Sequence, residues 1–357
     1  MSLSLYVDGD RWRDHLRAVA RAHPGIVPVA KGNGYGFGVA RLARRADWLG
    51  ADLMAVGTYD EAPEALKRFG GDVLVLSPWR PFVRAPEDPR LVHTVGRVED
   101  VKALVVASAR STRPRVLLEG LTSMRRHGLD PEQMRGLETS GVLSDVAVDG
   151  VALHLPMPSG RSSGAHVAEH RGHVAETEPW LSLARHLRVE PLYVSHLSDT
   201  ELAELRTRHP EVVLRPRIGT QLWLGDRGAL SPRATVLDVH AVAAGDRVGY
   251  RQRRIPRRGH VLVVSGGTAH GVGLEAPTAA TSVRSRAVAA ARGGLDAAGF
   301  ALSPFRVAGR QRWFVEPPHM QVSMLFVPDG VAVPSVGDEV DLDVRFTTTH
   351  FDRVTIS

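Results

Sequence analysis

Eight short β-prone runs recur along the first two-thirds of this 357-residue chain. They are separated by stretches in which apolar residues return every three or four positions, the spacing of an amphipathic helix. Strands that alternate with helices favour a parallel sheet, and eight such units predict a closed (β/α)8 barrel, an α/β fold. The runs are Ile26–Lys31, Asp52–Gly57, Val73–Ser77, Leu91–Val95, Arg115–Gly120, Val148–His154, Leu192–His196 and Val212–Arg217; the clearest helical stretches are Asp10–Ala22, Val98–Ala109 and Ala165–Leu187.

From about Leu230 the pattern changes to alternating or continuous apolar runs with glycine and proline turns between them, which is typical of β-structure. One helical stretch, about Thr278–Ala298, interrupts these runs. We therefore predict a barrel over residues 10–225, followed by a mainly β domain over residues 226–357 that residues 1–9 join. The runs are Ala234–Val242, His260–Val264, Arg312–Val315, Gln321–Val327 and Glu339–Val344.

Lys31 stands at the end of the first predicted strand, in Val-Ala-Lys-Gly-Asn-Gly-Tyr-Gly-Phe-Gly at 29–38. The chain has only three lysines, the others being Lys67 and Lys102. An arginine could supply positive charge here, but its guanidinium does not deprotonate and cannot form a Schiff base. A lysine at a strand end before a glycine-rich turn suits covalent binding of an aldehyde cofactor.

Four other predicted strands also end in polar side chains. Because the active sites of such barrels lie at the C-terminal ends of the strands, these groups are expected on one rim with Lys31. The candidates are Arg126 just beyond strand five, His154 at the end of strand six, Ser195 and His196 at the end of strand seven, and Arg217 at the end of strand eight.

The Lys31 motif resembles the cofactor-lysine motif of alanine racemases, which has a Val-Val-Lys-Ala-Asn-Ala-Tyr-Gly-His-Gly type of sequence. Those enzymes use pyridoxal 5'-phosphate. The resemblance implies that Lys31 binds the cofactor covalently and acts as one proton-transfer base, and it gives roles to the other matched positions. Tyr35, Gly219, Thr220 and, as a partial match, Ser195 and His196 would bind the phosphate; Arg217 would face the pyridine nitrogen; and His154 would pack against the ring.

The substrate side of the resemblance rests on Arg126, Glu119 and Met324. Arg126 matches the family arginine near the substrate carboxylate. Glu119 stands where many alanine racemases have a carbamylated lysine that holds this arginine, so a Glu119–Arg126 pair is expected. Met324 is the remnant of a Met-Asp pair, which here reads Met324-Leu325.

The resemblance breaks at the second catalytic base. In alanine racemases this base is a tyrosine of a Gly-Tyr-Ala-Asp-Gly motif supplied by the partner subunit. Here Thr268 takes the place of the tyrosine and His270 that of the aspartate. Histidine titrates near neutrality, so His270 is the predicted second base, with His319 or Tyr250 as alternatives.

Three functions stay open at this stage. The first is an amino-acid racemase or epimerase with an atypical second base. The second is one-sided chemistry on the same cofactor, such as decarboxylation, elimination or retro-aldol cleavage. The third is an inactive homologue with a regulatory role. The residues do not name the amino-acid substrate, nor do they show whether a longer 272–323 segment opens or closes the site.

Composition bounds the remaining expectations. The chain has no cysteine, which excludes disulfides and thiolate metal sites, and we predict no metal. Neither a signal peptide nor an apolar stretch of membrane-spanning length is evident, so a cytoplasmic protein without membrane contact is expected. The net charge is +6, but the arginines are scattered, so nucleic-acid binding is not expected. The resemblance implies a homodimer with shared active sites.

Overall fold

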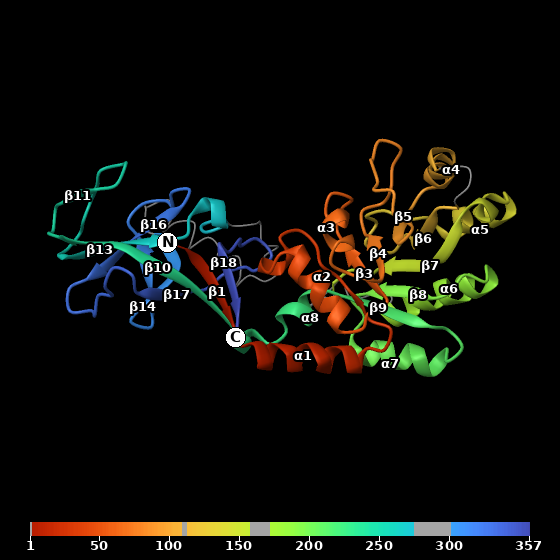
Figure 1. Ribbon diagram of the computed structural model, residues 1–357, viewed down its shortest axis with the longest axis horizontal. Coiled ribbons are helices and arrows are strands. Elements are labelled where there is room, and N and C mark those ends of the chain that lie inside the picture. Colours follow the sequence, from red (N-terminus) through yellow and green to blue (C-terminus); the bar gives the residue numbers. More distant parts are fainter. Residues whose placement is uncertain (1, 109–112, 158–171, 275–300) are drawn as a thin grey trace, which may run out of the picture. The chain divides into compact units, whose positions relative to one another are not determined.

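The computed structural model describes residues 2–108, 113–157, 172–274 and 301–357. They fall into two compact units (Figure 1). The barrel unit comprises 15–34 and 38–225. The β unit comprises residues from the N-terminus to 14, residues 35–37 and residues 226–357.

The barrel unit is built on an eight-stranded parallel sheet in the order β2-β9-β8-β7-β6-β5-β4-β3. A bridge between Val29 and Ala55 joins the two ends, so the sheet closes. The predicted (β/α)8 barrel is therefore confirmed. The strands are β2 (Val27–Pro28), β3 (Leu53–Val56), β4 (Asp72–Val75), β5 (Leu91–Val95), β6 (Arg115–Gly120), β7 (Ala147–His154), β8 (Leu192–Ser195) and β9 (Leu214–Ile218).

Helices surround these strands (Figure 1). Two of them begin at capping boxes, formed by Asp130 and Gln133 at α5 and by Ser198 and Glu201 at α7. In each pair, the side chain of one residue accepts a hydrogen bond from the backbone N–H of the other. The helices with residues in this unit are α1 (Gly9–Ala22), α2 (Val39–Trp48), α3 (Ala62–Leu66), α4 (Val98–Ala107), α5 (Pro131–Thr139), α6 (His173–His186), α7 (Asp199–Arg208) and α8 (Thr220–Leu224).

The alternation has one exception, because no helix lies between β4 and β5. The connecting segment contains Pro78, Pro81, Pro86 and Pro89. Proline lacks the N–H group that a helix interior needs, which accounts for the extended loop. The helix predicted over Ala165–Leu187 is confirmed only from residue 173, and its first residues lie outside the described part of the chain.

Apolar side chains fill the barrel interior. One cluster takes residues from seven neighbouring strands and from the bridged residue Val29. Because successive residues of a strand face opposite sides, the next inward position on each strand lies two residues further along. The cluster consists of Val27, Val29, Leu53, Ala55, Leu74, Val92, Leu117, Ala152 and Tyr193.

The β unit contains a second closed sheet, in which β13-β16-β15-β14-β17-β10 pair in that order and β10 pairs again with β13. Strands β1 and β18 extend it beyond β10. The predicted mainly β character of this domain is confirmed, and β14 and β18 are strands that the sequence pattern did not predict. The strands are β1 (Leu3–Val7), β10 (Leu230–Val242), β13 (Gly259–Ser265), β14 (Leu302–Val307), β15 (Arg310–Phe314), β16 (Val322–Pro328), β17 (Glu339–Leu342) and β18 (Arg353–Ile356).

The β unit buries two separate apolar clusters. The larger includes Leu3, Val236, Leu262 and Phe305. The smaller consists of Val242, Ile255, Val261, Val315 and Phe326, beside a hairpin of β11 (Arg247–Val248) and β12 (Arg253–Arg254). The helix predicted at 278–298 lies outside the described residues. No described helix is long and apolar enough to cross a membrane.

Candidate active site

A polar layer lies directly above the apolar interior of the barrel. Lys31, Glu119, His154 and Ser195 each stand two residues after a member of the interior cluster, namely Val29, Leu117, Ala152 and Tyr193. The period of two along a strand therefore directs these side chains to the same end of the barrel. The predicted gathering of polar groups at one rim thus follows from the strand register.

Lys31 lies in a positively charged part of this rim. Burial by neighbouring protein atoms lowers the pKa of its ammonium group, although the side chain still reaches solvent. The nearby guanidinium charges of Arg126 and Arg217 lower the pKa further. A lysine in this environment has a larger neutral fraction, which is the nucleophilic and basic form.

Glu61 is a site residue that the sequence analysis missed. Its carboxylate accepts a hydrogen bond from the Gly32 N–H at 3.0 Å and another from the Gly57 N–H at 2.7 Å. It thereby ties the loop after Lys31 to the end of β3, and its negative charge raises the pKa of Lys31. A glutamate directly before a short helix carries no motif of its own, so only the fold brings it to the lysine.

Arg217 is held by three acceptors inside the barrel. Its Nε–H donates to Ser195 Oγ at 3.1 Å, one Nη donates to the Leu153 carbonyl at 2.9 Å, and the other lies 3.4 Å from Glu119 Oε2. The Arg217 and Glu119 side chains are 2% and 3% exposed. The guanidinium orientation is therefore fixed by the strands around it.

The expected Glu119–Arg126 pair is not formed, which corrects the sequence interpretation. Glu119 points into the barrel from β6 and meets Arg217, which points inward from β9. Arg126 lies beyond the strand end on an exposed loop. Glu119 lies two residues after the inward-facing Leu117, so its side chain also faces the barrel interior. It therefore meets inward-facing residues of other strands rather than the loop that carries Arg126.

Two histidines border Lys31 and Arg217. The rings of His154 and His196 meet edge to face, with centroids 4.9 Å apart. Burial lowers the pKa of His154 to about 3, with the charge of Arg217 acting in the same direction. Burial followed by the charge of Lys31 lowers the pKa of His196. Both rings are therefore neutral at physiological pH and can pack against a flat ligand without adding charge.

Gly219 and Thr220 begin the short helix α8 directly after β9. N–H groups in the first turn of a helix have no intrahelical acceptor and are suited to anions. The position of α8 is fixed by Trp223, whose indole N–H donates to the Val29 carbonyl at 2.8 Å. The same residue thus links α8 to the segment that carries Lys31.

The loop that carries Arg126 is closed by backbone hydrogen bonds between Leu121 and Leu129 and between Leu129 and Glu119. Gly128 allows this closure, because a Cβ there would lie 2.5 Å from the Leu121 nitrogen. Next to Arg126, the buried Nε2 of His127 has no hydrogen-bond partner among the described residues. His127 is a second rim residue that sequence motifs did not single out.

Three predicted site residues belong to the β unit, namely Tyr35, His270 and Met324. Tyr35 is buried, with the left-handed backbone angles φ 54° and ψ 32° between Gly34 and Gly36. Met324 lies on β16 and packs against the smaller apolar cluster. The phosphate role of Tyr35 and the substrate role of Met324 stay predictions.

His270 closes its own turn. The Gly267 N–H donates to His270 Nδ1 at 3.3 Å, and Nε2 lies 3.2 Å from Asp352 Oδ1. The other oxygen of Asp352 accepts the Leu3 N–H at 2.8 Å. The imidazole is buried and both its nitrogens are engaged, so this geometry favours a bracing role over the predicted role of second base.

We therefore expect His270→Ala to lower the free energy of unfolding by about 1–3 kcal/mol, the usual cost of leaving a buried hydrogen-bonding group unpaired. Urea denaturation measures this loss. His240→Ala, at an exposed histidine in β10, is the matched control and is expected to change stability by less than about 0.5 kcal/mol. An unchanged unfolding midpoint in His270→Ala would contradict the bracing role.

Comparison with known proteins places these residues in a family. The family model for the alanine racemase N-terminal domain matches residues 7–220. Alanine racemases of Mycobacterium bovis and Mycobacterium tuberculosis are each 27% identical to this chain over 280 residues, covering 72% of the chain and 71% of the relative.

Solved structures show the same fold. The structure of alanine racemase from Bartonella henselae with covalently bound pyridoxal phosphate matches over 100% of both chains, with a TM-score of 0.69 and 15% identity. Biosynthetic alanine racemase from Pseudomonas aeruginosa matches over 97% of this chain and 91% of its own, with a TM-score of 0.64 and 22% identity. Since the family model covers more than half of the sequence, this chain belongs to the alanine racemase family.

Proposed function

We propose that this protein is a pyridoxal-phosphate-dependent amino-acid racemase in which Lys31 binds the cofactor covalently. The observation that carries the proposal is the rim itself: a lysine with a lowered pKa, a buried arginine held in one orientation and the N-terminus of α8 gather at the C-terminal end of one barrel. When bound, pyridoxal phosphate supplies an electrophilic aldehyde and a conjugated ring that withdraws electrons from the substrate Cα.

The donor set fits that group. The first-turn N–H groups of Gly219 and Thr220 suit its phosphate. The family resemblance assigns Tyr35 to the phosphate as well. Arg217 uses three of its N–H donors within the barrel and retains others for the ring nitrogen. His154 and His196 offer neutral rings that would pack against the flat cofactor ring. Arg126 would bind the substrate carboxylate, and the neutral amine of Lys31 would take and return a proton at Cα.

The second base belongs to the β unit in this proposal. With His270 engaged, His319 has the more suitable geometry. Its Nε2 lies 2.7 Å from Glu316 Oε1, and that carboxylate is buried. The Tyr250 ring packs on His319 with centroids 4.5 Å apart. A carboxylate that orients an imidazole is a common arrangement for proton transfer.

A second function is favoured by one observation. Thr268 replaces the family tyrosine, and its hydroxyl is too weakly acidic to act as a phenol does. If no group of the β unit takes over, the same rim supports one-sided chemistry such as decarboxylation or elimination. The family resemblance also supports a homodimer, which sedimentation at micromolar concentration would establish.

The test is solvent deuterium exchange at Cα, with chiral analysis of the product. A racemase incorporates deuterium and yields both enantiomers. One-sided chemistry gives a different product, or incorporates deuterium with retained configuration. A non-catalytic homologue gives neither deuterium exchange nor product. In His319→Gln we expect exchange to persist for one enantiomer and to fall roughly 100-fold for the other, the lower end of what an acid–base group contributes. Equal exchange of both enantiomers in this variant would exclude His319.

Glu61→Gln tests the position of Lys31 without turnover. Because the Glu61 carboxylate raises the pKa of Lys31, its neutralisation should lower that pKa. The pH midpoint for reductive methylation of Lys31 in cofactor-free protein should therefore move downward. Glu64→Gln, at an exposed residue of the same helix, is the control and should leave the midpoint in place. An upward shift in Glu61→Gln would contradict this placement.

A further inference from the structure

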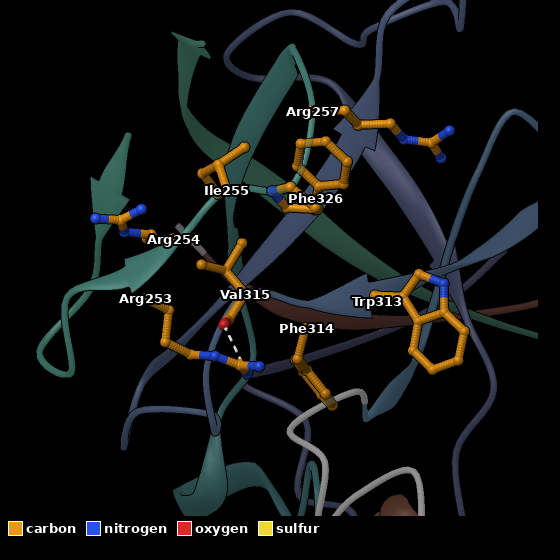
Figure 2. Close-up of a pocket in the computed structure, with 9 residues that line it drawn as sticks. Arg253, Arg254, Ile255, Arg257, Trp313, Phe314, Val315 and Phe326 are labelled. Carbon is orange, nitrogen blue, oxygen red and sulfur yellow. Dashed lines mark hydrogen bonds between the residues drawn. The ribbon is translucent and has the colours of Figure 1, made fainter. Parts of the chain in front are cut away.

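A cavity of about 310 Å³ lies in the β unit, and none of the candidate active-site residues lines it (Figure 2). It lies between the segment that follows the β11–β12 hairpin and the strands β15 and β16. Its apolar surface continues the smaller cluster, because Ile255, Val315 and Phe326 belong to both. The nine lining residues are Arg253, Arg254, Ile255, Pro256, Arg257, Trp313, Phe314, Val315 and Phe326.

The charge of the lining has one sign. Three of the nine residues are arginines and none is acidic. Arg253 is half-buried and is held by a hydrogen bond from Nη1 to the Val315 carbonyl at 3.1 Å. Arg254 and Arg257 are exposed. Arg254 also pairs across the hairpin with Arg247, which places two like charges opposite each other.

The carboxylates near this cavity are already engaged. Glu316, next to Val315, accepts the backbone N–H groups of Tyr250 and Arg251 and binds His319. Asp329 pairs with Arg258. Within the described part of the chain, these acids are therefore occupied elsewhere, and the positive charge at the cavity lacks a compensating partner among its own lining residues.

The remaining lining is aromatic and aliphatic. In Figure 2, Ile255, Val315 and Phe326 lie between the arginine pair Arg253 and Arg254 on one side and Trp313 on the other. Trp313 stands opposite Phe326 in the strand register and is 38% exposed. A cavity of this volume is at the small end of ligand sites, which combine apolar walls with a few polar groups that fix orientation.

From this combination we propose that the cavity binds a small amphipathic anion, an aryl or branched aliphatic group that carries one carboxylate. The apolar part would lie against Ile255, Phe326 and Trp313. The carboxylate would be bound by Arg253, the half-buried arginine of the lining, whose planar guanidinium group suits it. The site is independent of the proposed racemase chemistry, because no residue of the barrel rim contributes to it.

Isothermal titration of the full-length protein with 4-phenylbutyrate tests the proposal, with 4-phenylbutanamide as the neutral counterpart of nearly the same shape. We expect saturable one-site binding of the carboxylate and at least about tenfold weaker binding of the amide, since charge-assisted hydrogen bonds are roughly twice as strong as neutral ones. Equal affinity for both compounds would overturn the anionic assignment, and no binding of either would overturn the site.

Variants locate the binding. Arg253→Gln should weaken 4-phenylbutyrate binding at least about tenfold, and Trp313→Ala should weaken both compounds. The matched control is Arg310→Gln, which removes an exposed arginine of β15 outside the cavity and should leave the affinity unchanged.

If Arg253→Gln and Arg310→Gln have the same affinity for 4-phenylbutyrate, the anion binds elsewhere and the proposal fails. If the apparent affinity falls as protein concentration rises, with a matching rise in mass, the occupant is a second copy of this chain and the small-molecule assignment is wrong. Amino-acid turnover should be the same in all of these variants, because none removes a residue of the catalytic rim or the proposed second base His319.

Discussion

Replacing Lys31 with alanine should abolish the visible absorbance of the bound cofactor and lower the turnover of amino acids by roughly 10³-fold or more. A general acid–base group alone contributes ~10²–10⁴-fold to the rate. The variant also loses the covalent bond to the cofactor, which lowers turnover further. The fold should be unaffected, because the Lys31 side chain reaches solvent at the rim and does not belong to the apolar interior.

The small number of lysines makes this experiment clean. Lys67→Ala and Lys102→Ala are the controls, since both residues are exposed and together with Lys31 they complete the set of lysines. After borohydride reduction, the cofactor should be found on the peptide that contains Lys31. A variant Lys31→Ala that keeps the original absorbance band would show that another group binds the cofactor.

Removing Arg217 should have the largest effect on stability. In Arg217→Leu, the Glu119 carboxylate stays buried without its cation, and Ser195 and the Leu153 carbonyl lose their donor. Breaking a buried ion pair from one side costs ~3–5 kcal/mol, so the free energy of unfolding should fall by about that amount. Urea denaturation of the cofactor-free protein measures this change without any contribution from ligand binding.

Two comparisons show whether the loss comes from the isolated carboxylate. The double variant Arg217→Leu/Glu119→Leu should recover part of the loss, because it removes both charges. Arg208→Ala breaks an ion pair with Glu178 on the surface, where both side chains are substantially exposed, and should cost less than about 1 kcal/mol. A loss of less than 1 kcal/mol in Arg217→Leu would mean that the buried pair contributes little.

Much of the barrel and its rim is predictable because both depend on local periodicity. The apolar alternation around Leu117 and Ala152 defines strands, and the same period of two brings Glu119 and His154 to the rim. The resemblance around Lys31 adds the cofactor. None of these steps requires knowledge of which strands are neighbours.

The features that the sequence did not reveal depend on contacts between distant segments. Glu119 meets Arg217 across 98 residues of chain, whereas the nearer Arg126 lies on a loop outside the barrel. Glu61 joins the site only through hydrogen bonds to Gly32 and Gly57. The role of His270 depends on Asp352, and no pattern near residue 270 indicates that pairing.

The placement of β1 has a consequence for the synthesis of this protein. Leu5 and Val7 pair on one side with β10 and on the other, in parallel, with β18, whose residues 353–356 are made roughly 350 positions later. At about 5–20 residues per second, the ribosome needs roughly 20–70 s to span that distance. During this time the edge of β1 that pairs with β18 is uncovered, so the nascent chain offers an apolar binding segment to chaperones. A ribosome stalled before residue 353 leaves that segment exposed.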